Sequence, residues 1–408
     1  MLDSDDMRLV FTDAATQARA ATRLKLLLVA CLGALSFAYV GKGFFVAIFR
    51  DSSDVWRRRL EERFVLGEYI DPRFAASFIR RGVVYPPWSY FSGALLFWPP
   101  WPQVRVWFAL VNFACLIWIV GFVAGYGRDQ SKLDRLLVVL SVTAVAAFCT
   151  TIGVGNYGVI VVALLLGAYQ ADEAGYPVLS GLLMGVALLK PQLAGPFLLI
   201  ALMRGRFRSL AAAATYLIVA TTAIWAISRT DPVRMLLQAV RMAGTYAGTT
   251  NGLLTPVLNI GIPYRLAAPL TAIASLAIFT PLLYYYRERS PMLLFAIAAV
   301  LSRLWTYNLN TSNLILVFLL LALWRLAIET RDARASGLFL AVGASLWIPA
   351  RFSEYPVIQL AEHLIWLGGL IGLLILDRRL LVSEELAIRD RPAPSAAVVG
   401  QPKMAGEA

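Results

Sequence analysis

Histidine and cysteine are scarce in this sequence, and their scarcity excludes several kinds of site. A single histidine, His363, is present, which excludes a histidine-rich metal centre and most histidine-based catalysis. The three cysteines (Cys31, Cys115 and Cys149) all fall in apolar stretches and predict no disulfide framework. Walker A, HExxH and GxSxG motifs are also absent from the sequence. Nothing in the sequence requires a metal or a cofactor.

Charged residues are also scarce in this sequence. They make up 15% of the 408 residues, while 59% are hydrophobic; soluble domains have about 25% charged and about 45–50% apolar residues. This composition excludes a cytosolic enzyme and a disordered chain, and it predicts a multi-pass membrane protein. The net charge of +12 is then expected in cytoplasmic loops and near anionic lipid headgroups rather than on a nucleic-acid-binding surface.

Twelve apolar stretches are candidates for membrane-spanning helices. A spanning helix needs ~20 apolar residues, or fewer where it borders a cavity inside the protein. The candidates are residues 24–49, 104–125, 135–152, 157–170, 178–190, 191–204, 209–228, 264–285, 291–304, 314–328, 336–349 and 357–376. The sequence thus predicts an all-α bundle of about 12 transmembrane helices. Residues 85–100 are apolar too, but prolines bracket them, so we expect a short or re-entrant helix there.

The basic turns set the orientation of this bundle. Twelve crossings put both termini on one side, and with that side in the cytoplasm the basic turns lie there as well. They contain Arg128, Lys132 and Arg135; Arg204, Arg206 and Arg208; Arg287 and Arg289; Arg325, Arg331 and Arg334; and Arg378 and Arg379. We therefore expect a cytoplasmic tail at 1–23, a membrane domain at 24–380, and a cytoplasmic, disordered tail at 381–408.

The predicted extracytoplasmic loop 50–83 departs from the charge rule because it is rich in arginine, Arg58 included. Apolar residues at helical spacing predict two amphipathic helices on the outer membrane surface, the second beginning at Asp71-Pro72, an N-cap followed by proline. The arginines have two interpretations. They form a solvated face near lipid headgroups, or they recognise an anionic substrate such as a lipid phosphate, which guanidinium groups bind bidentately.

Polar residues gather at the predicted outer turns of the bundle. Because short apolar helices cannot end in hydrocarbon with unsatisfied backbone groups, such turns predict an outward-facing aqueous cavity. The residues at these turns are Asn156, Lys190, Gln192, Asn251, Arg303, Tyr307, Asn308, Asn310, Asn313, Arg351 and Glu354. Lys190 follows an uncharged run and is followed by Pro191. It either extends its ammonium group to the interface or binds a phosphate.

Asp54 follows the first apolar stretch closely. One interpretation is a helix N-cap, since an aspartate just before an amphipathic helix is typical of that position. The other is a general base that faces the cavity and accepts a proton from a hydroxyl group. The sequence leaves both open.

Four segments in this order resemble glycosyltransferase family 87, a family of polyprenyl-phosphate-sugar-dependent membrane enzymes with the GT-C fold. They are DVWRRRLEERFVLG (54–67) with YPPW (85–88), GNYG (155–158), LSGLLMGVALLKPQLAGPFLLIALMRGRF (179–207) and SRLWTYNLNTSN (302–313). The resemblance extends over residues 24–330. It departs from the family pattern at Asn156, where glutamine is usual, at Tyr307-Asn308, where a tyrosine-histidine pair is expected, and at Ser312-Asn313, where Asp-Asn is expected.

The resemblance implies an inverting sugar transfer, mannose-like or pentose, from a polyprenyl-phosphate donor to a lipid or glycan hydroxyl on the extracytoplasmic face of a bacterial plasma membrane. Asp54 takes the role of the catalytic base, with Asp51 as the alternative. Basic residues would stabilise the departing lipid phosphate, and Lys190, Arg303 and Arg58 are the candidates. The candidate substrate-binding residues are Tyr85, Asn156, Gln192, Asn251, Tyr307 and Asn308.

Two other functions remain compatible with the sequence. A transporter or flippase of lipid-linked sugars also has many spans and a polar cavity. Such proteins are typically built from internal repeats, and no convincing repeat is found here. A non-catalytic relative that binds polyprenyl phosphate is the second alternative, favoured only by the altered turn at 308–313.

Overall fold

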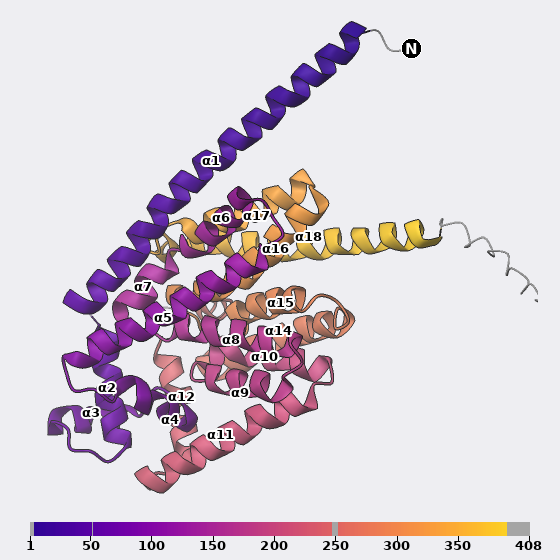
Figure 1. Cartoon of the computed structure of the whole chain (residues 1–408). Helices are drawn as coiled ribbons and strands as arrows, with labels where there is room; N and C mark the ends of the chain where they lie inside the picture. Colours follow the sequence, from indigo (N-terminus) through magenta and orange to yellow (C-terminus); the bar gives the residue numbers. More distant parts are fainter. Residues whose placement is uncertain (1–3, 51, 247–251, 390–408) are drawn as a thin grey trace, which may run out of the picture.

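A computed structural model of the chain describes residues 4–50, 52–246 and 252–389 (Figure 1). Within these residues the protein is helical, with no strand. The helices are α1 (Ser4–Phe49), α2 (Ser53–Val65), α3 (Pro72–Arg81), α4 (Pro87–Phe97), α5 (Gln103–Tyr126), α6 (Lys132–Thr143), α7 (Ala147–Val154), α8 (Gly158–Glu173), α9 (Pro177–Ala187), α10 (Pro191–Met203), α11 (Phe207–Ser228), α12 (Pro232–Tyr246), α13 (Leu254–Asn259), α14 (Tyr264–Tyr285), α15 (Pro291–Leu304), α16 (Val317–Thr330), α17 (Ala333–Trp347) and α18 (Pro356–Arg389). Two 3-10 segments, η2 (Asn310–Leu316) and η3 (Phe352–Glu354), precede α16 and α18.

The apolar stretches predicted as spans all coincide with helices, but the count of twelve crossings is not established. Among the described residues, 6 helices are long and apolar enough to cross a membrane, and the count rises to 7 if α6 and α7, bent by 49°, form one span. The six are Arg19–Phe49, Gln103–Tyr126, Phe207–Ser228, Tyr264–Tyr285, Asn310–Thr330 and Pro356–Arg379. These helices identify a multi-pass membrane protein.

Three further apolar helices are shorter than these six, and one of them, α15, is enclosed by the bundle. Helices α9, α10 and α15 have 11, 13 and 14 residues, so α15 is only about 20 Å long, shorter than the ~30 Å hydrocarbon core. From Met292 to Leu304 every residue of α15 is buried. Its centre is a cluster of three rings, Phe197, Phe295 and Phe318, whose centroids lie 5.1–5.3 Å apart.

The structure describes only the first part of the tail predicted at 381–408. Helix α18 continues to Arg389, and residues 390–408 lie outside the described part of the chain. At the other end of the chain, α1 is already helical at Ser4, well before its apolar part (Figure 1).

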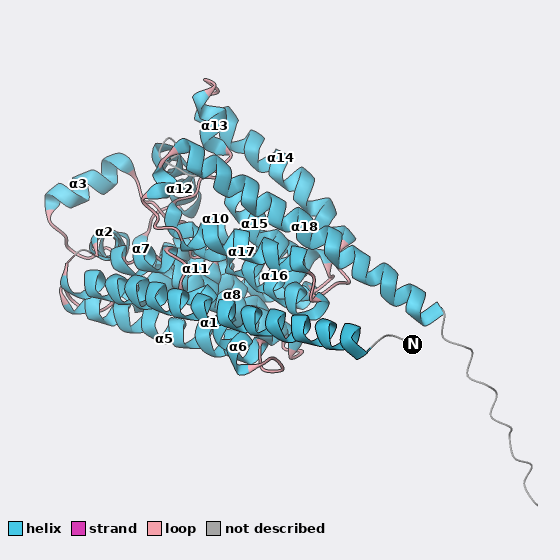
Figure 2. Cartoon of the chain, turned by 90° about the horizontal axis from the view of Figure 1, so that it is seen from above, coloured by secondary structure: helices cyan, strands magenta, loops and turns pink. Residues whose placement is uncertain are grey.

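The two helices predicted in the loop 50–83 are present as α2 and α3. Asp71 caps α3 by accepting a hydrogen bond from the Arg73 backbone N–H at 2.8 Å, and Pro72 is the first helical residue, as predicted. The aromatic side chains of α3 contact those of α2 through Trp56–Phe74 and Phe64–Phe78 pairs. Figure 2 shows α3 at one edge of the molecule, beside α2.

Helix α2 does not simply lie on a surface with one apolar face, and in this respect the prediction is wrong. Arg59, Glu61 and Glu62 are buried in it together with Val55 and Leu60. The reason is that α2 packs against α4, α5 and α7 as well as α3, and these neighbours supply polar partners that the sequence of α2 does not reveal.

The proline-bracketed stretch 85–100 forms the 11-residue helix α4, which is too short to cross a membrane. The first turn of α4 is fixed to the turn between α9 and α10. The Trp88 indole donates to Leu188 O at 2.9 Å, and the Ser89 hydroxyl donates to Leu189 O at 3.0 Å. These bonds bring the residues before α4 close to Lys190.

Candidate active site

A cavity of about 120 Å³ lies where α2, the segment before α4, and the turns α7–α8, α9–α10 and α15–η2 meet. Its lining residues are Asp54, Arg57, Arg58, Val84, Tyr85, Asn156, Lys190, Gln192, Tyr307, Leu309 and Ser312. Most of the predicted site residues are therefore brought together, although they are distributed over more than 250 positions of the sequence.

Asp54 lies in the first turn of α2 but does not cap it. The N-cap position is Ser52, with φ at 86° and no side-chain capping bond. The Asp54 carboxylate instead accepts a hydrogen bond from the Asn156 amide nitrogen at 3.4 Å.

The contact between Asp54 and Asn156 depends on the close approach of two turns. Helix α7 ends at Gly155, whose φ of 80° is left-handed, and a Cβ at this position would collide with Val55 Cγ2 on α2. Only glycine satisfies both the conformation and the lack of space. The next residue, Asn156, consequently faces the start of α2.

Lys190 completes a hydrogen-bonded chain with these two residues. Its ammonium group donates to the Asn156 amide oxygen at 2.8 Å, and the Gly158 backbone N–H donates to the same oxygen at 3.2 Å. These two donors orient the Asn156 amide so that its nitrogen points to Asp54. Lys190 is only 2% exposed, so its side chain does not extend along the surface to the interface.

Arg58 lies one helical turn after Asp54 on the same face of α2. Its guanidinium carbon is 4.0 Å from the centre of the Tyr85 ring, and its Nη1 lies 3.0 Å from Glu61 Oε2. Burial alone lowers the pKa of this guanidinium, but the neighbouring Tyr85, Glu61 and Asp54 outweigh burial and raise it above the ordinary value. Arg58 is therefore a permanent cation in the cavity wall.

Glu61 organises this wall and was not predicted from the sequence. Its side chain is fully buried and accepts hydrogen bonds from the Val84 backbone N–H and the Tyr90 hydroxyl, in addition to the ion pair with Arg58. These bonds join α2 to α4 and to the segment before it. The charged run in which Glu61 stands is typical of a solvated helix, and only its spacing of three from Arg58 hints at an ion pair.

The opposite wall of the cavity is built from Gln192 and Tyr307. The Gln192 amide donates to the Tyr307 hydroxyl at 3.3 Å, and the Trp305 indole donates to Gln192 O at 2.8 Å. Arg57 and Ser312 also line the cavity, but they were not among the predicted site residues.

The remaining predicted residues are not in the cavity. Arg303 is fully buried, with its Nη1 donating to Leu309 O at 3.2 Å and its guanidinium carbon 5.5 Å from the Trp366 ring. The Asn308 amide donates to Ser302 O at 2.8 Å. Both residues support the turn that carries Tyr307. Asp51 and Asn251 lie outside the described residues.

A second, mainly apolar cavity of about 440 Å³ adjoins the polar one. The two share Val84, Tyr85, Gln192 and Tyr307. Beyond these shared residues, the apolar cavity is lined by Pro86, Trp88, Pro191, Leu236, Ala239, Val240, Ala243, Tyr264, Ala268, Pro269, Ala272, Trp305 and Thr306. A charged pocket thus continues into an apolar groove between α12 and α14.

Comparison with protein families identifies the class of this membrane protein. The model of glycosyltransferase family 87 matches residues 84–304, which is more than half of the chain. The chain belongs to glycosyltransferase family 87, so the predicted resemblance is confirmed and the protein is a membrane glycosyltransferase. The matched region includes Tyr85, Asn156 and Lys190, whereas Asp54 and Tyr307 lie outside it. No curated protein matches the chain.

Proposed function

We propose that this glycosyltransferase moves a sugar, a mannose-like hexose or a pentose, from a polyprenyl-phosphate donor to a hydroxyl group of a lipid or glycan acceptor. The transfer occurs with inversion on the extracytoplasmic face of a bacterial plasma membrane. The observation that carries the proposal is the hydrogen-bonded chain Asp54–Asn156–Lys190 in a cavity that continues into an apolar groove.

Asp54 acts as the general base in this proposal. The acceptor oxygen attacks the anomeric carbon of the sugar while its proton passes to the Asp54 carboxylate. The bond between the anomeric carbon and the phosphate oxygen breaks, and its electron pair remains on the phosphate. Because attack and departure occur on opposite sides of the sugar ring, the configuration inverts.

Lys190 and Arg58 stabilise the departing phosphate. The donor is a phosphate diester with one negative charge, and its lipid product is a monoester that gains a second one. A cation already fixed in a buried site, as Arg58 is, stabilises such a developing charge more than a cation in water does. Burial lowers the pKa of Lys190 to about 7, so a phosphate bound beside it favours its protonated form. Both side chains are held in the cavity wall, Lys190 by Asn156 and Arg58 by Glu61.

The apolar groove is suited to the prenyl chain of the donor. It begins at the same residues that close the polar cavity, so a lipid phosphate in the cavity has its chain directed into the groove. Leu236 and Val240 on α12 are 41% and 54% exposed, and they give the groove an apolar surface that is open to lipid. Tyr85, Gln192 and Tyr307 are at the junction, where we expect them to contact the sugar.

The test is sugar transfer from a panel of radiolabelled polyprenyl-phosphate sugars, measured with the purified full-length protein in membranes. We expect wild type to transfer one of the sugars and Asp54→Asn to lose about 10²–10⁴-fold in rate, the usual contribution of a general base. Asp71→Asn is the matched control. It makes the same change in the same loop, at a residue that caps α3 away from the cavity, and should keep wild-type transfer.

Three results would contradict this proposal. Full transfer by Asp54→Asn would remove it as the base, and loss of transfer in Asp51→Asn alone would give that role to Asp51. Uptake of a lipid-linked sugar into sealed vesicles without any glycosidic product would favour a transporter instead.

A further inference from the structure

A separate polar cavity of about 280 Å³ lies at the other end of the bundle. It is enclosed by the end of α5, the turn between α14 and α15, and the helices α16 and α18. Its lining residues are Tyr126, Arg289, Ser290, Met292, Leu293, Ala322, Arg325, Leu326, Glu329, Leu373 and Asp377. None of these residues lines the candidate active site or its groove.

Charges of both signs face this cavity. Arg289 donates two hydrogen bonds to Asp377 Oδ2, from Nε at 3.1 Å and from Nη2 at 3.0 Å. Arg325 donates from Nε to Glu329 Oε1 at 2.6 Å. A guanidinium group has five N–H donors and a carboxylate has about four acceptor positions, so these bonds leave capacity on both sides for a ligand.

The cavity is open enough to exchange its contents. The Arg289 and Asp377 side chains are 28% and 18% exposed, while those of Arg325 and Glu329 are 51% and 49% exposed. The Arg325 guanidinium carbon lies 5.3 Å from the Tyr126 ring, which restrains the arginine on one side. The Arg289–Asp377 pair is therefore partly shielded from solvent, and the Arg325–Glu329 pair is more exposed.

Helix α15 adds a further positive element. Ser290 occupies its N-cap position and makes no side-chain capping bond, and Ser290, Met292 and Leu293 all line the cavity. The N-terminus of a helix carries a partial positive charge that favours phosphate; in α15 Pro291 has no N–H and the Leu293 N–H donates to Ser290 O, which leaves the Met292 N–H for a ligand. The start of α15 and the two arginines form the positive part of the cavity, and Asp377 and Glu329 form its negative part. Such a cavity suits a ligand that carries both a positive and a negative charge.

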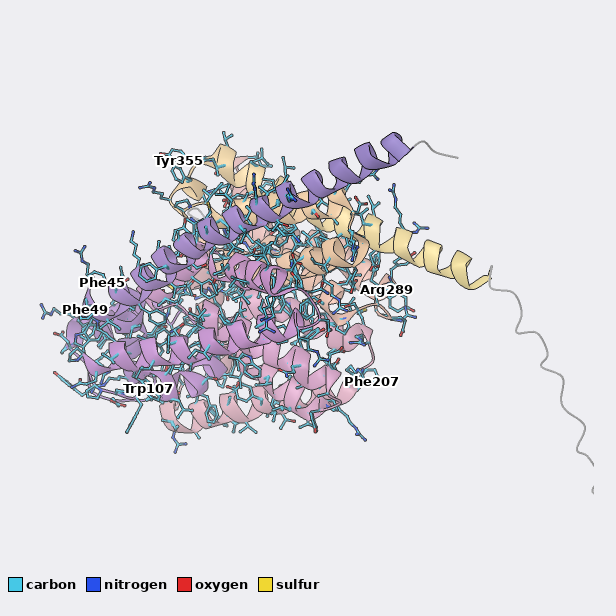
Figure 3. The ribbon with its side chains drawn as sticks, turned by 45° about the horizontal axis from the view of Figure 1, so that its top comes forward. Phe45, Phe49, Trp107, Phe207, Arg289 and Tyr355 are labelled. Atoms are coloured by element: carbon cyan, nitrogen blue, oxygen red, sulfur yellow. The ribbon has the colours of Figure 1, made fainter. Side chains whose placement is uncertain are left out.

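The position of the cavity indicates where such a ligand comes from. Helix α15 leads from this cavity to Leu304, beside the active-site turn, over about 20 Å. Figure 3 shows Arg289 at the opposite end of the molecule from Phe45 and Phe49, which adjoin α2. The arginine-rich turns lie at the Arg289 end, where the cytoplasmic headgroups are expected.

We propose that this cavity binds the headgroup of a phospholipid that carries both a phosphate and a primary ammonium group. The phosphate contacts Arg289, Arg325 and the start of α15, and the ammonium group donates to Asp377 and Glu329. A purely anionic headgroup fits less well, because its phosphate would lie beside the carboxylates of Asp377 and Glu329 and would leave their remaining acceptor positions without a donor. A choline headgroup has no N–H to donate. The site is independent of the sugar-transfer proposal.

The test measures lipid retention by native mass spectrometry of the purified full-length protein, with phosphatidylethanolamine, phosphatidylglycerol and phosphatidylcholine added in equal amounts. Wild type should retain phosphatidylethanolamine preferentially. Asp377→Asn should lower the ratio of retained phosphatidylethanolamine to phosphatidylglycerol about tenfold, the effect of losing one charge-assisted hydrogen bond. Glu329→Gln should shift the ratio in the same direction. It provides a second reading if Asp377→Asn folds poorly.

Asp172→Asn is the matched control, because Asp172 pairs with Arg204 and Arg206 outside this cavity; its lipid ratio should equal that of wild type. Glycerophosphoethanolamine, the headgroup without acyl chains, should displace the retained lipid, whereas glycerophosphoglycerol should not. Equal retention of the ethanolamine and glycerol lipids by wild type would overturn the proposal. The same conclusion would follow if neither Asp377→Asn nor Glu329→Gln changed the ratio, or if both soluble headgroups displaced the lipid equally.

Discussion

Two neighbouring glutamates on α2 show how much depends on the partners of a single buried group. Glu61 accepts hydrogen bonds from Val84 and Tyr90. Glu62 is 4% exposed and its Oε1 has no hydrogen-bond partner. On its other side, a Cβ at Gly93 would lie 2.6 Å from Glu62 Oε2, so the carboxyl group in its present position requires glycine there. Burial raises the pKa of Glu62 well above its ordinary value, and the nearby Glu61 and Glu68 add to this effect.

Glu62 should therefore cost stability at neutral pH. In the unfolded chain a glutamate loses its proton near pH ~4.3, while the folded protein holds the proton to a higher pH. The unfolded state is thus favoured as pH rises above ~4.3, and stability falls. We expect Glu62→Gln to raise the apparent Tm at pH 7 by about 2–4 °C, with the difference disappearing near pH 4. Thermal unfolding at both pH values checks this prediction.

Glu68→Gln changes an exposed member of the same group and should leave the Tm unchanged. A lower Tm for Glu62→Gln at pH 7 would show that the ionised carboxylate is stabilised.

At the scale of elements, the turn between α7 and α8 sets the shape of the active site. It brings Asn156 to Asp54 on one side and to Lys190 on the other. The turn thereby connects α2 with the start of α10, although these two helices are far apart in the sequence. The close approach at Gly155 is what allows this, because the absence of a Cβ there leaves room for the Val55 side chain of α2.

Gly155→Ala should accordingly impair transfer. The left-handed conformation costs roughly 1–2 kcal/mol for a residue with a Cβ, and the new methyl group would push α2 away from the turn. We expect a loss of at least about tenfold in kcat, as a small displacement of a catalytic group produces. Gly175→Ala is the control: its φ of +77° imposes the same strain, but nothing lies within 4 Å of its Cβ, so it should keep wild-type kcat. Combining Gly155→Ala with Val55→Ala should recover part of the rate. No recovery would mean that strain, not contact with α2, causes the loss.

Local signals in the sequence predicted the helices and turns better than they predicted which side chains contact one another. The Asp71-Pro72 pair predicted the start of α3, and the outer turns predicted the meeting of Asn156, Lys190 and Tyr307. The burial of Glu61 and the direction of Arg303 were not predictable. Each depends on a helix far away in the sequence: Glu61 on Tyr90 of α4, and Arg303 on Trp366 of α18. The number of crossings is not fixed by the sequence for a similar reason, since apolar composition is the same for a helix in lipid and a helix enclosed by other helices.

The whole molecule has a polar cavity at each end, the candidate active site at one and the cavity lined by Arg289 at the other. Each cavity therefore faces a defined side of the membrane. The basic turns predict that the end carrying Arg289 faces the cytoplasm and that the end carrying α2 faces outward. This orientation also decides from which side each ligand arrives.

Cysteine labelling in intact cells tests the orientation. In a variant with alanine at Cys31, Cys115 and Cys149, single cysteines are introduced at Asp231, after α11, and at Asp129, after α5; both positions are exposed. A membrane-impermeant maleimide should label Asp231→Cys in intact cells and Asp129→Cys only after permeabilisation. The reverse pattern would invert the molecule and move the candidate active site to the cytoplasm.

The enclosure of α15 has a consequence for how the protein is made. This helix of 14 residues is too short to partition alone across a hydrocarbon core of ~30 Å, and its packing partner α10 leaves the ribosome about 100 residues earlier. Insertion of α15 by the translocon must then wait for, and be guided by, helices that are already assembled in the membrane. We therefore expect α15 to be inserted late, against helices such as α10 that are already in the membrane. In a chain truncated before α14, the face of α10 that packs on α15 would be exposed to lipid.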